Sequence, residues 1–103
     1  MSTKKSYGLK DPEKRLGKAT VGEFLHTWRT TEELSLKDFG KKLGLSVANL
    51  CDIEKGRKGV SPEKAQQIAR AIGVPPALLV RLSIEELLRN VGLKYTVEVK
   101  TAA

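Results

Sequence analysis

The segment 34–58, with the sequence LSLKDFGKKLGLSVANLCDIEKGRK, constrains the fold more than any other part of the chain. Its pattern predicts two short helices joined by a glycine turn. Ser35 is placed to cap the first helix, over 36–43, and Gly44 stands where a helix ends in a left-handed residue. Each helix is apolar on only one side, so the two are expected to pack against each other.

The second helix of this pair is predicted over 47–55, with Ser46 as its cap. Gly40 has no side chain and should let the second helix cross close over the first. Apolar residues of both helices and of the turn predict a small shared core: Phe39, Leu43, Leu45, Leu50 and Ile53. The other side of helix 47–55 remains free for other contacts.

A capping box predicts a helix before this pair, because Thr20 is followed three residues later by Glu23. The helix should cover 21–31, or one residue more, and brace the pair that follows. His26 lies on it without a second ligand one helical turn away, so it is expected to be a surface residue rather than a metal ligand. The apolar side of this helix consists of Val21, Phe24, Leu25 and Trp28.

Two more helices are predicted after the pair. Ser61 and Pro62 form a cap and a first helical residue, and Gly73 ends that helix. The next helix, over 77–91, carries more apolar residues than one stripe holds: Leu78, Leu79, Val80, Leu82, Ile84, Leu87, Leu88 and Val91. Either it breaks near Ser83 and folds back, or part of its surface is a subunit interface, and the interface is favoured.

Residues 93–100, LKYTVEVK, alternate strictly between apolar and polar, which predicts a β-strand. No other segment shows this pattern, and a lone strand cannot satisfy its backbone hydrogen bonds. Its partner must therefore come from another chain, and a second copy pairing antiparallel about a two-fold axis is the expected donor. The predicted dimer contacts are Leu87, Leu88, Val91, Leu93, Tyr95, Val97 and Val99.

The charge of the chain favours a polyanionic partner. The formal net charge is +7; residues 35–58 carry six basic and three acidic side chains, and residues 1–20 carry six and two. Basic surface also fits RNA, an anionic membrane or simple solubility. With one Cys, one His and no nucleophile–base pair, we expect no metal, no cofactor and no enzyme. The lone Cys and the lack of a signal peptide predict a reducing cytoplasm.

Over residues 21–82 the pattern resembles the helix-turn-helix of the lambda Cro and repressor family, also called the XRE family. The resemblance rests on the apolar, glycine and Ile-Glu-x-Gly positions of that motif: Phe39, Gly40, Leu43, Gly44, Leu45, Leu50, Ile53, Glu54 and Gly56. It implies an all-α, five-helix Cro/repressor-like domain over 20–82, with a C-terminal β-strand pairing across a homodimer. A flexible basic arm, 1–19, would precede the domain, and a helix extension with the dimerisation strand, 83–103, would follow it. Such a protein would be bacterial or phage-encoded and nucleoid-associated.

The resemblance implies a dimeric, sequence-specific DNA-binding transcription regulator, expected to be a repressor, with helix 47–55 in the major groove of a pseudo-palindromic operator. Base contacts are expected from Val47, Ala48, Asn49 and Asp52. Phosphate contacts are expected from Lys37, Lys41, Ser46, Arg57 and Lys58. Leu36 and Val47 stand where the family often has Gln, which leaves the base code open. In the same pattern Arg29 reaches Glu54, so a bidentate ion pair should lock two helices together.

Alternatives remain open at several places. The arm 1–19 is either a solvated tail or a segment that lies along phosphates or enters a minor groove. Cys51 is expected to be a half-buried packing thiol rather than a redox switch. The segment 61–73 and the Leu-rich helix after it also resemble HigA-type antitoxins, which implies a toxin as a further partner whose sheet the strand could extend. The remaining alternative is a protein-interaction module that has lost DNA binding.

Overall fold

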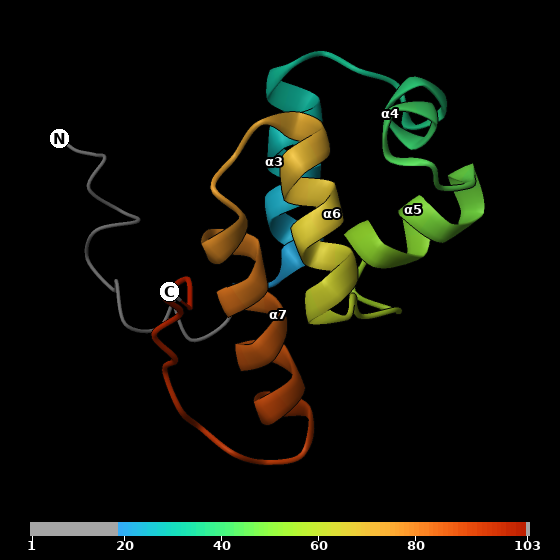
Figure 1. Ribbon diagram of the computed structural model, residues 1–103. Coiled ribbons are helices and arrows are strands. Elements are labelled where there is room, and N and C mark those ends of the chain that lie inside the picture. The colour runs from blue at the N-terminus through green and yellow to red at the C-terminus, as the bar shows by residue number, and fades with distance from the viewer. Residues whose placement is uncertain (1–18, 103) are drawn as a thin grey trace, which may run out of the picture.

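The computed structural model describes residues 19–102, which form an all-helical domain of five α-helices (Figure 1). In chain order the helices are α3 (Val21–Thr31), α4 (Leu36–Leu43), α5 (Val47–Glu54), α6 (Pro62–Ile72) and α7 (Pro76–Asn90). The predicted arm 1–19 lies, apart from its last residue, outside the described residues. None of the helices in the described part is long and apolar enough to cross a membrane.

The helices begin and end at the residues that the sequence marks for this purpose. Ser46 Oγ accepts a hydrogen bond at 3.1 Å from the backbone N–H three residues later, and Ser35 and Ser61 cap α4 and α6 in the same way. Gly44 and Gly73 end α4 and α6 in the left-handed conformation, with φ of 73° and 78°. All five predicted helices are confirmed, with each end within one residue of its expected place.

One apolar core holds the helices together. α6 packs mainly on α7, while α3 and α4 both pack on α5. The rings of Trp28 and Phe39 stack with their centroids 5.5 Å apart, which joins α3 to α4. Leu45, in the turn, is only half-buried. The buried apolar residues are Val21, Leu25, Phe39, Leu43, Leu50, Ile53, Val60, Ala65, Ile68, Ala69, Ile72, Leu79 and Leu82.

α7 is one continuous helix, so the alternative of a break near Ser83 is wrong. Ser83 is buried, and its hydroxyl donates a 2.7 Å hydrogen bond to a carbonyl in the preceding turn. Leu79 and Leu82 enter the core, but Leu87 and Val91 are 51% and 71% exposed. Part of the apolar surplus of α7 therefore stays on the surface of the chain.

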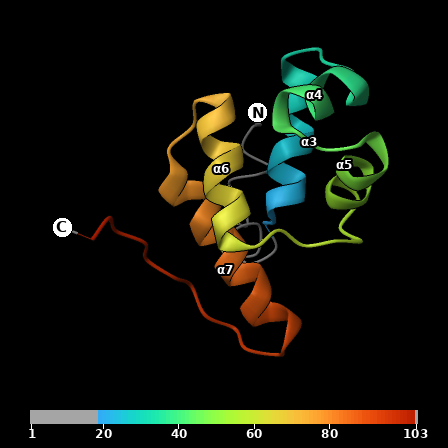
Figure 2. The ribbon, with the colours of Figure 1, turned by 45° about the vertical axis from the view of Figure 1, so that its right-hand side comes forward.

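Residues 93–102, called the tail below, are extended but form no β-strand, contrary to the sequence prediction for 93–100. The chain turns at Gly92, where φ is 84°, and runs back along α7 (Figure 2). A strand requires a ladder to a neighbouring strand, and the described part of the chain supplies none. Val97 N–H instead donates to Glu85 Oε2 at 2.7 Å.

Candidate nucleic-acid interface

Gly40 makes room for the turn between α4 and α5. A Cβ at this position would lie 2.6 Å from Leu45 O, and Leu45 N–H donates to Gly40 O at 2.8 Å. The expectation that Gly40 lets α5 cross close over α4 is therefore corrected. The glycine instead seats the turn backbone against α4, and the turn sets the direction in which α5 leaves.

Gly22 provides the close contact between α3 and α5. A Cβ on Gly22 would lie 1.9 Å from Ile53 O and 2.9 Å from Ile53 C. The start of α3 thus touches the backbone at the end of α5, and no other residue fits there without movement. The role of Gly22 was not predicted from the sequence. The available signal was a glycine inside a helical pattern, which often marks a close backbone approach.

Arg29 and Glu54 form a bidentate ion pair that joins α3 to the end of α5. Arg29 Nε donates to Glu54 Oε2 at 2.8 Å, and Nη2 donates to Oε1 at 3.0 Å. Arg29 Nη1 also donates to Leu34 O at 2.9 Å. The Glu54 side chain is only 4% exposed, and His26 Nδ1, on an exposed ring, lies 2.9 Å from Glu54 Oε1. Burial opposes ionisation of Glu54, but hydrogen bonds from Arg29 and His26 outweigh it, so the pKa of this carboxyl is lowered.

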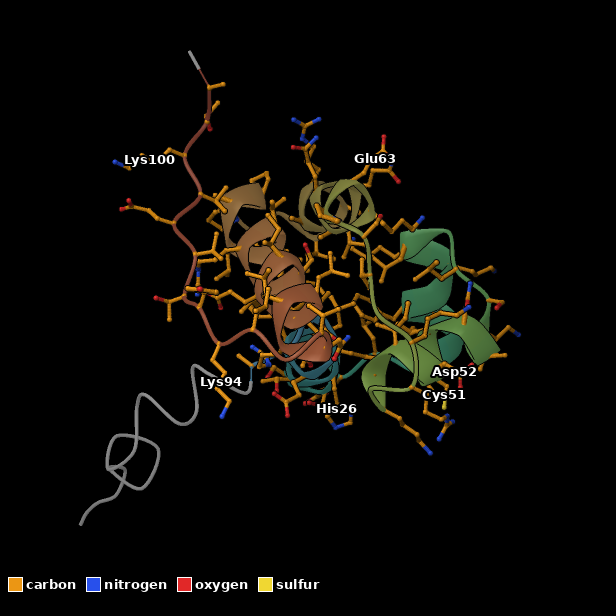
Figure 3. All side chains as sticks on the ribbon, turned by 90° about the horizontal axis from the view of Figure 1, so that it is seen from below. His26, Cys51, Asp52, Glu63, Lys94 and Lys100 are labelled. Carbon is orange, nitrogen blue, oxygen red and sulfur yellow. The ribbon has the colours of Figure 1, made fainter. Side chains whose placement is uncertain are left out.

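The four predicted base-contacting residues lie on the side of α5 away from the core. Val47 is 46% exposed and Ala48 is exposed, while Asn49 and Asp52 are half-buried. Figure 3 places Asp52 at the opposite side of the molecule from Lys100, in the tail. Since Gly22 and the Arg29–Glu54 pair fix the other side of α5, this side is presented on a rigid support.

The loop after α5 folds back onto two of these residues. Gly56, with φ of 79°, turns the chain, and Arg57 N–H donates to Asp52 O at 2.8 Å. The Arg57 side chain bonds Asp52 Oδ1 through Nε at 3.0 Å, and Lys58 Nζ donates to Asn49 Oδ1. The two cations, called the loop cations below, were predicted to lie at phosphates. Their bonds to α5 were not anticipated from the sequence.

The remaining predicted phosphate contacts lie on α4 and at the start of α5. Lys37 and Lys41 are both exposed and stand one helical turn apart. Ser46 is exposed, and its Oγ accepts the capping hydrogen bond of α5, so its own hydroxyl hydrogen is free to donate. Two exposed lysines on α4 and the Ser46 hydroxyl at the start of α5 are therefore available to donate to phosphates.

Cys51 is half-buried on α5, beside the Arg29–Glu54 pair. It lines a shallow pocket of about 210 Å³ together with His26, Arg29, Leu36, Glu54 and Lys55. Within residues 19–102 no group of three or more His, Cys, Asp or Glu side chains gathers in a way that could hold a metal ion.

Fold and surface together define a small helical domain that presents α5 of a helix-turn-helix to solvent. In a comparison with protein families, residues 20–82, more than half of the 103-residue chain, match the family described as helix-turn-helix domain. The chain belongs to this family, and its membership indicates a DNA-binding protein. The comparisons with curated proteins and with solved structures found no match.

Proposed function

We propose that the protein is a sequence-specific transcription regulator of the XRE type that acts as a repressor. The observation that carries the proposal is the rigid presentation of α5, whose free side holds two exposed apolar residues and two polar ones. Exposed lysines lie on α4, and the loop cations bond the polar residues of α5. An α-helix of this kind fits the major groove with its N-terminal half against the bases.

Each of the four residues on that side has a matching contact in the groove. Val47 and Ala48 offer apolar contact to thymine methyl groups, Asn49 can bond base edges, and Asp52 can accept from a cytosine amino group. Asn49 and Asp52 already accept hydrogen bonds from the loop cations. The exposed Arg57–Asp52 ion pair contributes only about 0–1 kcal/mol, so exchanging its carboxylate for a phosphate on docking costs little. For Lys58 a phosphate is a charged acceptor that replaces the neutral amide of Asn49. The exchange would free Asn49 and Asp52 for bases.

The phosphate contacts set the position of α5 along the duplex. Lys37 and Lys41 on α4, Ser46 at the start of α5 and the loop cations would bond phosphates on the two sides of the groove. Two copies related by a two-fold axis would place two α5 helices in successive major grooves, roughly 34–36 Å apart. The operator is accordingly proposed to be pseudo-palindromic.

Gel shifts over a range of salt concentrations test the proposal, with DNA taken from upstream of the protein's own gene. Lys37→Ala should reduce the slope of log K against log salt by about one unit and weaken all sequences alike. Lys100→Ala is the matched control, because this residue lies on the far side of the molecule (Figure 3). Equal slopes for the wild type and Lys37→Ala would contradict the placement of α4, and no salt-dependent binding at all would favour an interaction module without DNA.

The exposed tail supports a second candidate, an antitoxin that binds a toxin and also represses its own promoter. Its backbone is extended, Tyr95 is 65% exposed, and such a segment can add a strand to the sheet of another protein. Coexpression with the product of the adjacent gene decides between the candidates. A stoichiometric complex that requires the tail would favour the antitoxin, and independent purification of the two products would contradict it.

A further inference from the structure

The tail and the end of α7 carry most of the exposed apolar side chains in the described chain. Of the five large apolar residues that are exposed, only Val47 belongs to the proposed DNA surface. The other four are Leu87, Val91, Leu93 and Tyr95, at 51%, 71%, 44% and 65% exposure. Two of them, Leu93 and Tyr95, belong to the extended tail, where a further strand would cover them.

The extended part of the tail contacts α7 through one backbone hydrogen bond. Val97 N–H donates to Glu85 Oε2 at 2.7 Å, and the Glu85 side chain is 3% exposed beneath the tail. In an extended chain, successive N–H groups point to opposite edges. The backbone groups of the odd-numbered residues therefore lie on the same edge as Val97 N–H, called the inner edge below, and those of the even-numbered residues lie on the opposite, outward edge.

The outward edge has no acceptor in the described chain. Among residues 19–102, no hydrogen bond joins the backbone N–H groups of Thr96, Glu98 or Lys100 to another group. On the inner edge Tyr95 N–H and Val99 N–H also have no partner among residues 19–102, so the two edges differ by the Val97–Glu85 bond. A further strand can pair with the outward edge, through the even-numbered residues, without breaking that bond.

The side chains select one register for such a strand. If a second copy pairs antiparallel with Thr96 on the two-fold axis, Lys94 stands opposite Glu98 of the partner subunit, and the reverse pair forms as well. On the other face Tyr95 stands opposite Val97 of the partner subunit, and Leu93 opposite Val99 of the partner subunit. Opposite-charge, aromatic–aliphatic and Thr–Thr pairs are those that stabilise antiparallel ladders.

Neighbouring registers lack this match. With Glu98 on the axis two carboxylates meet, and with Val97 on the axis Lys94 stands opposite Lys100 of the partner subunit. With Tyr95 on the axis neither Lys94 nor Glu98 has an oppositely charged partner. With Val99 on the axis Glu98 does face Lys100 of the partner subunit, but Leu93 has no partner and Tyr95 would face only an alanine.

We propose that a second copy of this chain pairs with the outward edge of the tail, antiparallel and with Thr96 on the two-fold axis. This inference rests on the proposed dimeric regulator and specifies its interface. The two-stranded ribbon covers the exposed Leu93 and Tyr95 and lies against α7 of both subunits. The bond from Val97 N–H to Glu85 occupies one position of the inner edge, which favours an assembly of two strands over an open sheet.

Cysteine cross-linking tests the register in the full-length protein with Cys51→Ser as the background. Paired residues on the axis have Cα atoms about 5.5 Å apart, within the roughly 4.4–6.8 Å that a disulfide spans. Two Glu98 residues would be roughly 14 Å apart, because four residue steps of about 3.4 Å separate them along the ribbon. Mild oxidation should therefore cross-link Thr96→Cys efficiently and Glu98→Cys hardly at all. Stronger cross-linking of Val97→Cys, Glu98→Cys or Val99→Cys, or a dimer that cross-links at none of these positions, would overturn the register.

Charge reversal tests the pairing without cysteines. Glu98→Lys places like charges opposite each other twice and should weaken the dimer by about 4- to 30-fold in sedimentation. Adding Lys94→Glu to the same chain should restore it, because both cross-strand pairs are then opposite again. Lys100→Glu is the matched control, since it faces Gly92 of the partner subunit in this register and should change little.

Neither assay contains DNA, so the two proposals can fail separately. A dimer with the Thr96 cross-link but no DNA binding would contradict the proposed function alone. A wild-type chain that stays monomeric in sedimentation at tens of micromolar would overturn the pairing and leave the tail edge for a different protein, even if half-site DNA binding persists.

Discussion

Replacing Gly22 by alanine should separate α3 from α5. The added Cβ would lie 1.9 Å from Ile53 O, whereas Cβ atoms essentially never approach a neighbour within 3.0 Å, so one helix must move by more than 1 Å. The moving backbone belongs to Ile53 and Glu54, and therefore also strains the ion pair with Arg29. Overpacking of this kind lowers the free energy of unfolding by about 1–3 kcal/mol and sometimes more. Alanine offsets part of this loss, because it is more favourable than glycine inside a helix by about 1 kcal/mol. We expect a net loss of about 2 kcal/mol, because the atoms in the way are backbone and cannot rotate aside.

Thermal and urea unfolding measure this loss. For a chain of this length, about 2 kcal/mol corresponds to a Tm lower by roughly 8–16 °C. Gly59→Ala is the matched control, because its Cβ would meet only the end of the Glu86 side chain, at 4.0 Å. A Gly22→Ala protein as stable as the Gly59→Ala protein would refute the close contact between α3 and α5, and with it the rigid support of the DNA-binding helix.

Three further predictions concern the ion pair, pH and the tail. Glu54→Ala should lower the free energy of unfolding by about 3–5 kcal/mol, because it leaves a sheltered Arg29 charge without its partner. Replacing both residues by apolar ones should recover part of this loss. If the effects of the single and double replacements on urea unfolding are additive, the pair contributes nothing. Because the pKa of Glu54 is lowered in the folded state, its ionised carboxylate stabilises the fold above the ordinary carboxyl pKa, and this stabilisation is lost as pH falls through the lowered value. The wild type should therefore lose more stability than Glu54→Gln below about pH 4. Parallel curves of stability against pH would contradict this. A chain ending at Gly92 should keep its far-UV helical signal but bind a full operator far more weakly than wild type. The reason is that two linked subunits bind the second half-site at an effective concentration of roughly millimolar order. Unchanged operator affinity would show that the tail does not join the subunits.

The helices were predictable because the signals that set them are local. A serine or threonine oxygen caps an N–H three residues away, and a glycine at the end of a helix supplies the left-handed residue within the same turn. These signals work without knowledge of the rest of the fold. The Arg29–Glu54 pair spans 25 residues, and it was expected only because the motif resembles a known family.

The features that the sequence did not disclose are non-local. Gly22 matters because Ile53 lies against it, and helical periodicity alone does not predict which backbone meets a glycine. The tail shows strand periodicity, yet whether it forms a ladder depends on a neighbour that the chain itself does not provide. Glu85 appeared as one polar residue among many on α7, and its buried bond to Val97 emerges only when the chain has turned at Gly92.

The most direct test of the central claim is a binding-site selection with the wild type, Asn49→Ala and Asp52→Ala. If α5 reads bases in the major groove, the wild type selects a pseudo-palindromic site, and each variant loses preference at one or two positions per half-site, by about 1–3 kcal/mol each. The positions lost should differ between the two variants, because the two side chains lie almost one helical turn apart on α5. The same selected sequence for the wild type and both variants would contradict the placement of α5 in the groove.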